Sequence, residues 1–142
     1  MIQYPLHFST KAHAQSGMNT IWNIDSSEFN LSCAIPPEFE GPGGALSPED
    51  LYAQALTNCF VATFKVYAEK SKLSFESLSA QGQLVVDLDE SKKPCMKKFN
   101  LKAEIKSPNS VEKAELLLQK AFKSGFILNS VKTELSLEVK VV

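Results

Sequence analysis

The sequence contains no arginine, because all fifteen of its basic residues are lysines. Arginine is the usual fork-shaped partner for carboxylates and other anions, so an ion pair in this protein must use the point charge of a lysine. Sixteen acidic residues nearly balance the lysines and leave a formal net charge of −1. This balance gives no electrostatic reason to expect nucleic acid or an anionic membrane as a partner.

Cysteine and histidine are also scarce. The three cysteines, Cys33, Cys59 and Cys95, form an odd and sparse set that is a poor disulfide framework, which favours a reducing compartment. The two histidines, His7 and His13, are isolated, and the chain has no Cys-x-x-Cys pair. We therefore expect neither a metal site nor a cofactor.

Long hydrophobic runs are absent as well. No apolar stretch approaches the roughly 20 residues that a membrane-spanning helix needs. The first residues show no basic segment followed by an apolar run, so no secretory signal is visible and we expect a cytoplasmic protein. The 142 residues, 44% of them hydrophobic, suit one ordinary core, and we predict a single domain over residues 1–142.

Alternating apolar and polar residues predict three short strands in the first part of the chain, over residues 2–8, 21–24 and 29–35. A glycine- and proline-rich loop follows and leads into a strong helix start. Ser47 is a suitable N-cap, Pro48 suits the first helical position, and Asp50 falls three residues after the cap. This pattern predicts a helix from there to about residue 70.

The remaining patterns predict strands over 78–88 and 99–105, a helix from Asn109 or Ser110 to about Ser124, and a strand over 133–141. The order βββ-α-ββ-α-β favours an α+β domain in which helices pack on a mostly antiparallel sheet. The first helix is too apolar to lie against one small sheet with its other side in water. We therefore expect a homodimer that covers the remaining surface.

Cys59 lies within the long helix, among alanine and phenylalanine residues. A lone helical cysteine is most often a small core residue. It is a reaction centre only where its surroundings favour the thiolate.

Three short motifs bear on this choice. They are the glycine-proline loop, the helix start and the stretch around the cysteine: Gly41-Pro42-Gly43-Gly44, Ser47-Pro48-Glu49-Asp50-Leu51 and Ala55-Leu56-Thr57-Asn58-Cys59-Phe60. Together with the following β-β-α-β order, they resemble the OsmC/Ohr family (osmotically inducible protein C-like, organic hydroperoxide resistance) over residues 36–142. The resemblance implies an intertwined α+β homodimer with a long central helix. It also implies thiol-dependent reduction of organic hydroperoxides, a peroxidase activity of oxidative-stress defence.

The resemblance assigns roles to particular residues. Cys59 matches the cysteine that attacks the peroxide, and Glu49 matches a glutamate at the helix start. Ten residues along one helix span about 15 Å, so Glu49 can share a site with Cys59 only if it comes from the partner subunit. A carboxylate that interacts with the helix dipole is the simpler explanation of Glu49. For the apolar part of a substrate we predict four contact residues, Phe60, Phe64, Phe126 and Ile127.

The chain departs from the family pattern at two points. Gly125 stands where the family has its second cysteine, although the nearby Asn129 and Ser130 are retained. The family's N-terminal arginine is also missing, and Lys11 is the substitute that we consider. A catalytic cycle would then need an external thiol as reductant.

Two other functions remain open from the sequence. A non-catalytic protein of the same fold could bind a small apolar ligand in the retained pocket. Alternatively, Cys95, which has four lysines within three residues, could serve as a redox-sensing thiol. The competing interpretation of Cys95 is an incidental cysteine in a solvated, charged turn.

Overall fold

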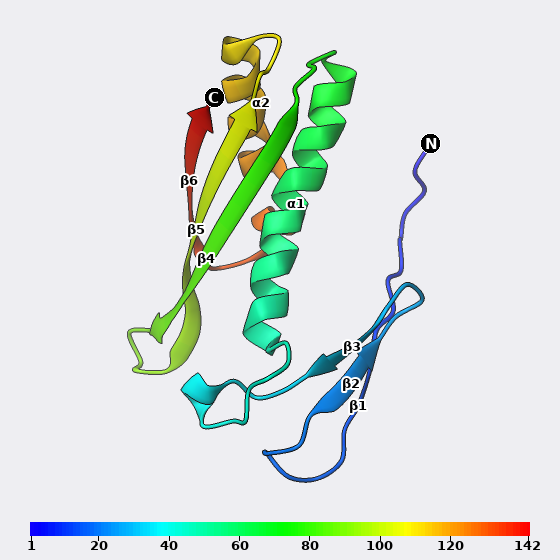
Figure 1. The fold of residues 1–142 in the computed structure, drawn as a ribbon, viewed down its shortest axis with the longest axis vertical. Helices are drawn as coiled ribbons and strands as arrows, with labels where there is room; N and C mark the ends of the chain where they lie inside the picture. The colour runs from blue at the N-terminus through cyan, green and yellow to red at the C-terminus, as the bar shows by residue number, and fades with distance from the viewer. The chain divides into compact units, whose positions relative to one another are not determined.

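The computed structural model describes all residues from 1 to 142 and contains two α-helices, six strands and two short 3₁₀-helices (Figure 1). The element order confirms the predicted βββ-α-ββ-α-β arrangement. The chain forms two compact units, residues 1–51 and 52–142, with the division near the start of the long helix. The elements in chain order are β1 (Lys11–His13), β2 (Trp22–Asp25), β3 (Asn30–Cys33), η1 (Pro37–Phe39), α1 (Pro48–Lys70), β4 (Ser77–Leu88), β5 (Pro94–Lys106), α2 (Val111–Ser124), η2 (Leu128–Ser130) and β6 (Glu134–Val141).

The first unit contains a three-stranded antiparallel sheet in the order β1-β2-β3. The predicted second and third strands are confirmed, but the predicted strand over residues 2–8 is wrong, since the first strand is β1. Residues 1–10 are all exposed. Alternation predicts a strand only where one face is buried, and Pro5 lacks the N–H group that a ladder needs.

Helix α1 starts with a reciprocal capping box. The Ser47 hydroxyl accepts a hydrogen bond from the Asp50 backbone N–H at 3.0 Å, and the Asp50 carboxylate accepts one from the Ser47 N–H at 2.9 Å. Ser47 is buried, so these bonds satisfy backbone donors that water does not reach. The predicted start and end of the helix are both confirmed.

The second unit is built on a three-stranded sheet in the order β4-β5-β6. Strands β4 and β5 form a long antiparallel hairpin, and β6 pairs with β5 in parallel. An irregularity between Val85 and Val86 shifts the register of the hairpin, so that Val85 pairs with Lys98 and Val86 with Met96. The predicted mostly antiparallel pairing is therefore present, but it is divided between two sheets and includes one parallel pair.

The core of the second unit lies between the two helices and one face of this sheet (Figure 1). Its side chains come from every fourth residue of α1, from alternate residues of β5 and from one stripe of α2: Leu56, Phe60, Phe64, Ala68, Phe99, Leu101, Ala103, Ile105, Ala114, Leu117, Leu118 and Ala121. These are the helical period of about 3.6 residues and the strand period of two. The core thus orients α1 and fixes which of its side chains face α2.

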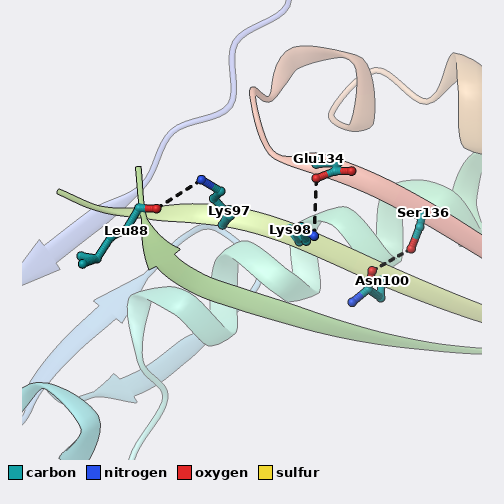
Figure 2. Close-up of polar contacts among 6 residues, drawn as sticks. All are labelled: Leu88, Lys97, Lys98, Asn100, Glu134 and Ser136. Carbon is teal, nitrogen blue, oxygen red and sulfur yellow. Dashed lines mark hydrogen bonds and ion pairs between the residues drawn. The ribbon is translucent and has the colours of Figure 1, made fainter. Parts of the chain in front are cut away.

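The opposite face of the sheet is polar. Lys98 lies 3.9 Å from Glu134, and the Ser136 hydroxyl donates to Asn100 at 2.7 Å, as Figure 2 shows. The Lys97 ammonium donates to the Leu88 carbonyl at 3.2 Å, where the hairpin register shifts. Ion pairs this exposed contribute little to stability, so the main effect of this face is to present charge to the solvent.

We predict that Ser47→Ala lowers the free energy of unfolding by about 1 kcal/mol, because it removes the cap of α1 and leaves the Asp50 N–H without its partner. Urea denaturation followed by circular dichroism measures the change. Ser91→Ala, in the exposed turn between β4 and β5, is the matched control and should leave the midpoint unchanged. Equal midpoints for Ser47→Ala and the unaltered chain would contradict the role of the cap.

Candidate functional site

Cys59 lies near the middle of α1, half-buried, on the edge of the core. It packs against the buried cluster that includes Leu56 and Phe60. Its side chain lies beside the buried stripe of the helix, on the flank that faces the end of α2. The thiol is therefore neither sealed in the centre of the core nor free on the surface.

Gly125 directly covers this thiol. It is the C-cap of α2 and is buried, and a Cβ atom placed on it would lie 2.9 Å from Cys59 Sγ and 3.0 Å from Leu128 Cδ1. The backbone of Gly125 has φ −58°, a value that any residue can adopt. The close approach of the Cys59 and Leu128 side chains, and not the backbone conformation, therefore favours a glycine here.

The separation between a Cβ on residue 125 and Cys59 Sγ can be compared with the spacing in a disulfide. In a disulfide, the Cβ of one cysteine lies about 3.0 Å from the sulfur of the other, because of the short S–S bond. The distance of 2.9 Å matches that spacing, although residue 125 carries no sulfur. An unbonded side chain at this position would have to displace the thiol.

Two tyrosine hydroxyls of α1 hold the segment that contains Gly125. The Tyr52 hydroxyl is 2.6 Å from the Thr133 hydroxyl, and the Tyr67 hydroxyl is 2.6 Å from the Ser124 hydroxyl. Sequence reasoning missed both tyrosines. The signal that could have found Tyr52 is its spacing, since it lies seven residues, or about two helical turns, before Cys59 and thus on the same side of the helix.

The four predicted substrate contacts divide into two pairs. Phe60 and Phe64 have no exposed surface in the single chain and form part of the core. Phe126 and Ile127 follow Gly125 directly and are 80% and 45% exposed. In the single chain, only the second pair offers apolar surface to a ligand.

Glu49 lies half-buried in the first turn of α1. The helix is continuous from Pro48 to Lys70, so its rise separates Glu49 from Cys59 by about 15 Å within one chain. Lys11 is exposed in β1, where it pairs in register with Asp25. A role for either residue at the thiol stays a prediction.

The other two cysteines lie in different settings. Cys33 is buried at the end of β3, and burial raises the pKa of its thiol, with a further contribution from the Asp50 carboxylate. Both effects disfavour the thiolate, which is the reactive form of the thiol. Cys95 is half-buried at the start of β5 and pairs in register with Asp87. All three cysteines are free thiols.

Other features of the structure do not point to a second reaction centre. A surface depression of about 250 Å³ on the polar face of the sheet is lined mainly by paired charges and includes no thiol. No group of three or more His, Cys, Asp or Glu side chains is arranged to hold a metal ion. Neither helix combines the length and the apolar character needed to cross a bilayer.

Comparison with known proteins gives consistent matches. Residues 41–140 match the family described as OsmC-like protein. The uncharacterized protein YmaD of Bacillus subtilis (strain 168) is 28% identical over 141 residues, which cover 95% of this chain and 94% of that protein.

Two solved structures illustrate the likeness in fold. An OsmC-like protein of unknown function from Vibrio cholerae has a TM-score of 0.84 at 18% identity, covering 95% of this chain and 99% of that one. An organic hydroperoxide resistance protein, OsmC, from Legionella pneumophila has a TM-score of 0.70 at 23% identity, covering 96% and 98%. The family match spans most of the chain, from the glycine loop through the helix with Cys59 to the last strand, and the chain therefore belongs to the OsmC-like protein family.

Proposed function

We propose that the protein reduces organic hydroperoxides in oxidative-stress defence, with Cys59 as the attacking thiol and an external thiol as the reductant. The observation that supports this best is the position of Cys59 Sγ, 2.9 Å from where a Cβ would stand on residue 125. A thiol at residue 125 would stand within bonding reach of Cys59, as a two-cysteine reaction requires. The hydroperoxide resistance protein among the structural relatives adds support from the family.

One protein thiol is sufficient for a complete catalytic cycle when an external thiol is the reductant. The Cys59 thiolate attacks the distal oxygen of ROOH, the O–O bond breaks, and the alkoxide takes up a proton to leave as ROH. The resulting sulfenic acid reacts with one external thiol, which releases water and forms a mixed disulfide. A second external thiol then releases Cys59 and an external disulfide, so that two thiols reduce each hydroperoxide.

An apolar substrate fits the surroundings of Cys59 better than hydrogen peroxide does. Phe126 and Ile127 expose apolar surface next to Gly125, and contact with a hydrocarbon tail would remove that surface from water. Phe60 and Phe64 would support the thiol from the core side.

A homodimer is part of this proposal. Val66 is 49% exposed and Ala62 is also exposed, so α1 leaves apolar side chains in water in the single chain. A second copy of the chain would cover these side chains, and its own Glu49 could then reach Cys59. Lys11 is the cation that we propose in place of the missing arginine.

A non-catalytic role is the second candidate. It is favoured by Gly125, which leaves Cys59 without a partner thiol, and by the absence of arginine, since no guanidinium can favour the thiolate. In that case Phe126 and Ile127 would contact a small apolar ligand that is not turned over.

We predict that cumene hydroperoxide is consumed in the presence of dithiothreitol or dihydrolipoamide, and that Cys59→Ser abolishes this turnover, because the only attacking sulfur is lost. Cys95→Ser should retain it, because Cys95 lies outside the site. A coupled assay of residual hydroperoxide gives the rates. No turnover together with an unreactive Cys59 would favour the ligand-binding role, and loss of activity only in Cys95→Ser would favour a redox-sensing role.

We predict that Gly125→Cys forms an intramolecular disulfide with Cys59 when the protein is treated with one equivalent of hydroperoxide, since the Cβ of residue 125 already stands at the required distance. Loss of two free thiols per chain and a cross-linked peptide in mass spectrometry would identify it. Asn129→Cys, four residues further along, is the matched control. Equal cross-linking of both variants would contradict the geometry of the site.

We predict that Glu49 acts across the dimer. Cys59→Ser and Glu49→Ala should each be weakly active or inactive alone, but after subunit exchange their mixture should regain about a quarter of the unaltered activity. Half of the dimers are then mixed, and each carries one complete site. Subunit exchange without recovered activity would exclude the arrangement, and a monomer in sedimentation would exclude the dimer.

A further inference from the structure

The segment 125–132, which joins α2 to β6, runs past Cys59 and is flanked by two hydroxyl groups. Ser124 immediately precedes it, and Thr133 immediately follows it. Each of these side chains is hydrogen-bonded to a tyrosine of α1, Ser124 to Tyr67 and Thr133 to Tyr52. The same helix that carries the thiol thus holds both ends of the segment that covers it.

The position of Cys59 between the two tyrosines is nearly central. The helical rise puts it about 10 Å from Tyr52 and about 12 Å from Tyr67 along the axis of α1. At about 100° per residue, the Tyr52 side chain lies within about 20° of Cys59 around the helix axis and the Tyr67 side chain about 80° to the side of it nearer the core. The two bonds therefore bracket the contact between Cys59 and Gly125.

The donor of one bond follows from the geometry. The Ser124 hydroxyl donates its single hydrogen to the Lys120 carbonyl at 2.8 Å, so the Tyr67 hydroxyl must be the donor to Ser124. The Lys120 ammonium also lies over the Tyr67 ring, 4.5 Å from its centre. Removing the Tyr67 hydroxyl alone would leave Ser124 and this ring contact in place.

No other side-chain hydrogen bond connects α1 to the part of the chain from α2 onward. Apart from the Lys120 ammonium over the Tyr67 ring and a hydrogen bond from the Lys113 ammonium to the Ser71 carbonyl just after α1, the side chains packed between them are mainly apolar, and apolar contacts are non-directional. The bonds inside segment 125–132, from the Asn129 N–H to the Gly125 carbonyl and from the Ser130 hydroxyl to the Phe126 carbonyl, shape the segment but do not attach it to α1. Leu128 anchors the segment in the apolar core, and the two tyrosine hydroxyls add the directional contacts at its two ends.

We propose that Tyr52 and Tyr67 are positioning residues of the Cys59 site, which hold segment 125–132 over the thiol through Thr133 and Ser124. This inference rests on the proposed role of Cys59 in one respect only, namely that a fixed cover matters for its chemistry. A displacement of about 1 Å is enough to impair a reaction that needs aligned atoms. The hydroxyls would hold Gly125, and with it Phe126 and Ile127, within that tolerance.

The test measures how easily a disulfide forms between residue 125 and Cys59. The Gly125→Cys chain is equilibrated with a mixture of reduced and oxidised glutathione. The thiols of Cys59 and residue 125 form a disulfide, and one molecule of oxidised glutathione is reduced to two molecules of glutathione. The fraction oxidised gives the effective concentration of the introduced thiol at Cys59. We expect Tyr67→Phe or Tyr52→Phe to lower it about fivefold, as the loss of one hydrogen bond implies. Ser124→Thr keeps a hydroxyl and should stay near the unaltered value.

Ser110→Ala is the matched control, because it removes the N-cap of α2 at the far end of the same helix. It should lower the stability to a comparable degree without changing the effective concentration. If Ser110→Ala acts as strongly as Tyr67→Phe, the effect is general loosening and the inference is wrong. An unchanged value in both tyrosine variants would also overturn it.

A second measurement leaves Gly125 in place. The rate at which iodoacetamide modifies Cys59, resolved peptide by peptide in mass spectrometry, should rise about fivefold in Tyr67→Phe and in Tyr52→Phe, while the rate at Cys95 stays constant. Equal rates at Cys59 in all variants would count against the inference. Neither readout needs peroxide turnover, so failure of the proposed function leaves this test intact.

Discussion

The burial of one stripe of α1 is the constraint on which the second unit depends. Leu56, Phe60 and Phe64 lie four residues apart and are completely buried against the sheet β4-β5-β6 and helix α2. Each such side chain contributes about 2 kcal/mol by leaving water. Because this stripe sets the rotation of the helix about its axis, it also determines which flank carries Cys59 and where that flank points. The site is thus a consequence of the core.

The close approach of α2 to Cys59 affects both the packing of the helix end and the access to the thiol. Gly125 lets the helix end come so near that no larger unbonded side chain would fit without displacing the thiol. In a two-cysteine protein, the same approach would place two sulfur atoms at bonding distance. Here it leaves a single thiol covered by backbone. The Tyr52 and Tyr67 hydroxyls, one toward each end of the covering segment, give this arrangement its precision.

Much of the fold could be read from local patterns. Ser47, Pro48 and Asp50 define the start of α1 because capping depends only on residues three positions apart. The alternation of apolar and polar residues predicted β4, β5 and β6, because each of these strands turns one face toward the core. The same alternation failed for residues 2–8, since those side chains bury nothing within the chain. The division into two sheets and the parallel pairing of β6 with β5 were also invisible, because pairing joins residues far apart in sequence.

The sequence by itself determined the order of elements, the capped helix with Cys59 on its flank, and the absence of arginine and of a second cysteine at position 125. These are properties of residue type and near-neighbour spacing. Only the tertiary structure decided that Gly125 covers the thiol, that Tyr52 and Tyr67 hold the covering segment, and that Phe126 is exposed while Phe60 is buried. The physical reason is that such contacts arise from the packing of α1 against a segment more than fifty residues further along the chain, where sequence spacing carries no information about distance.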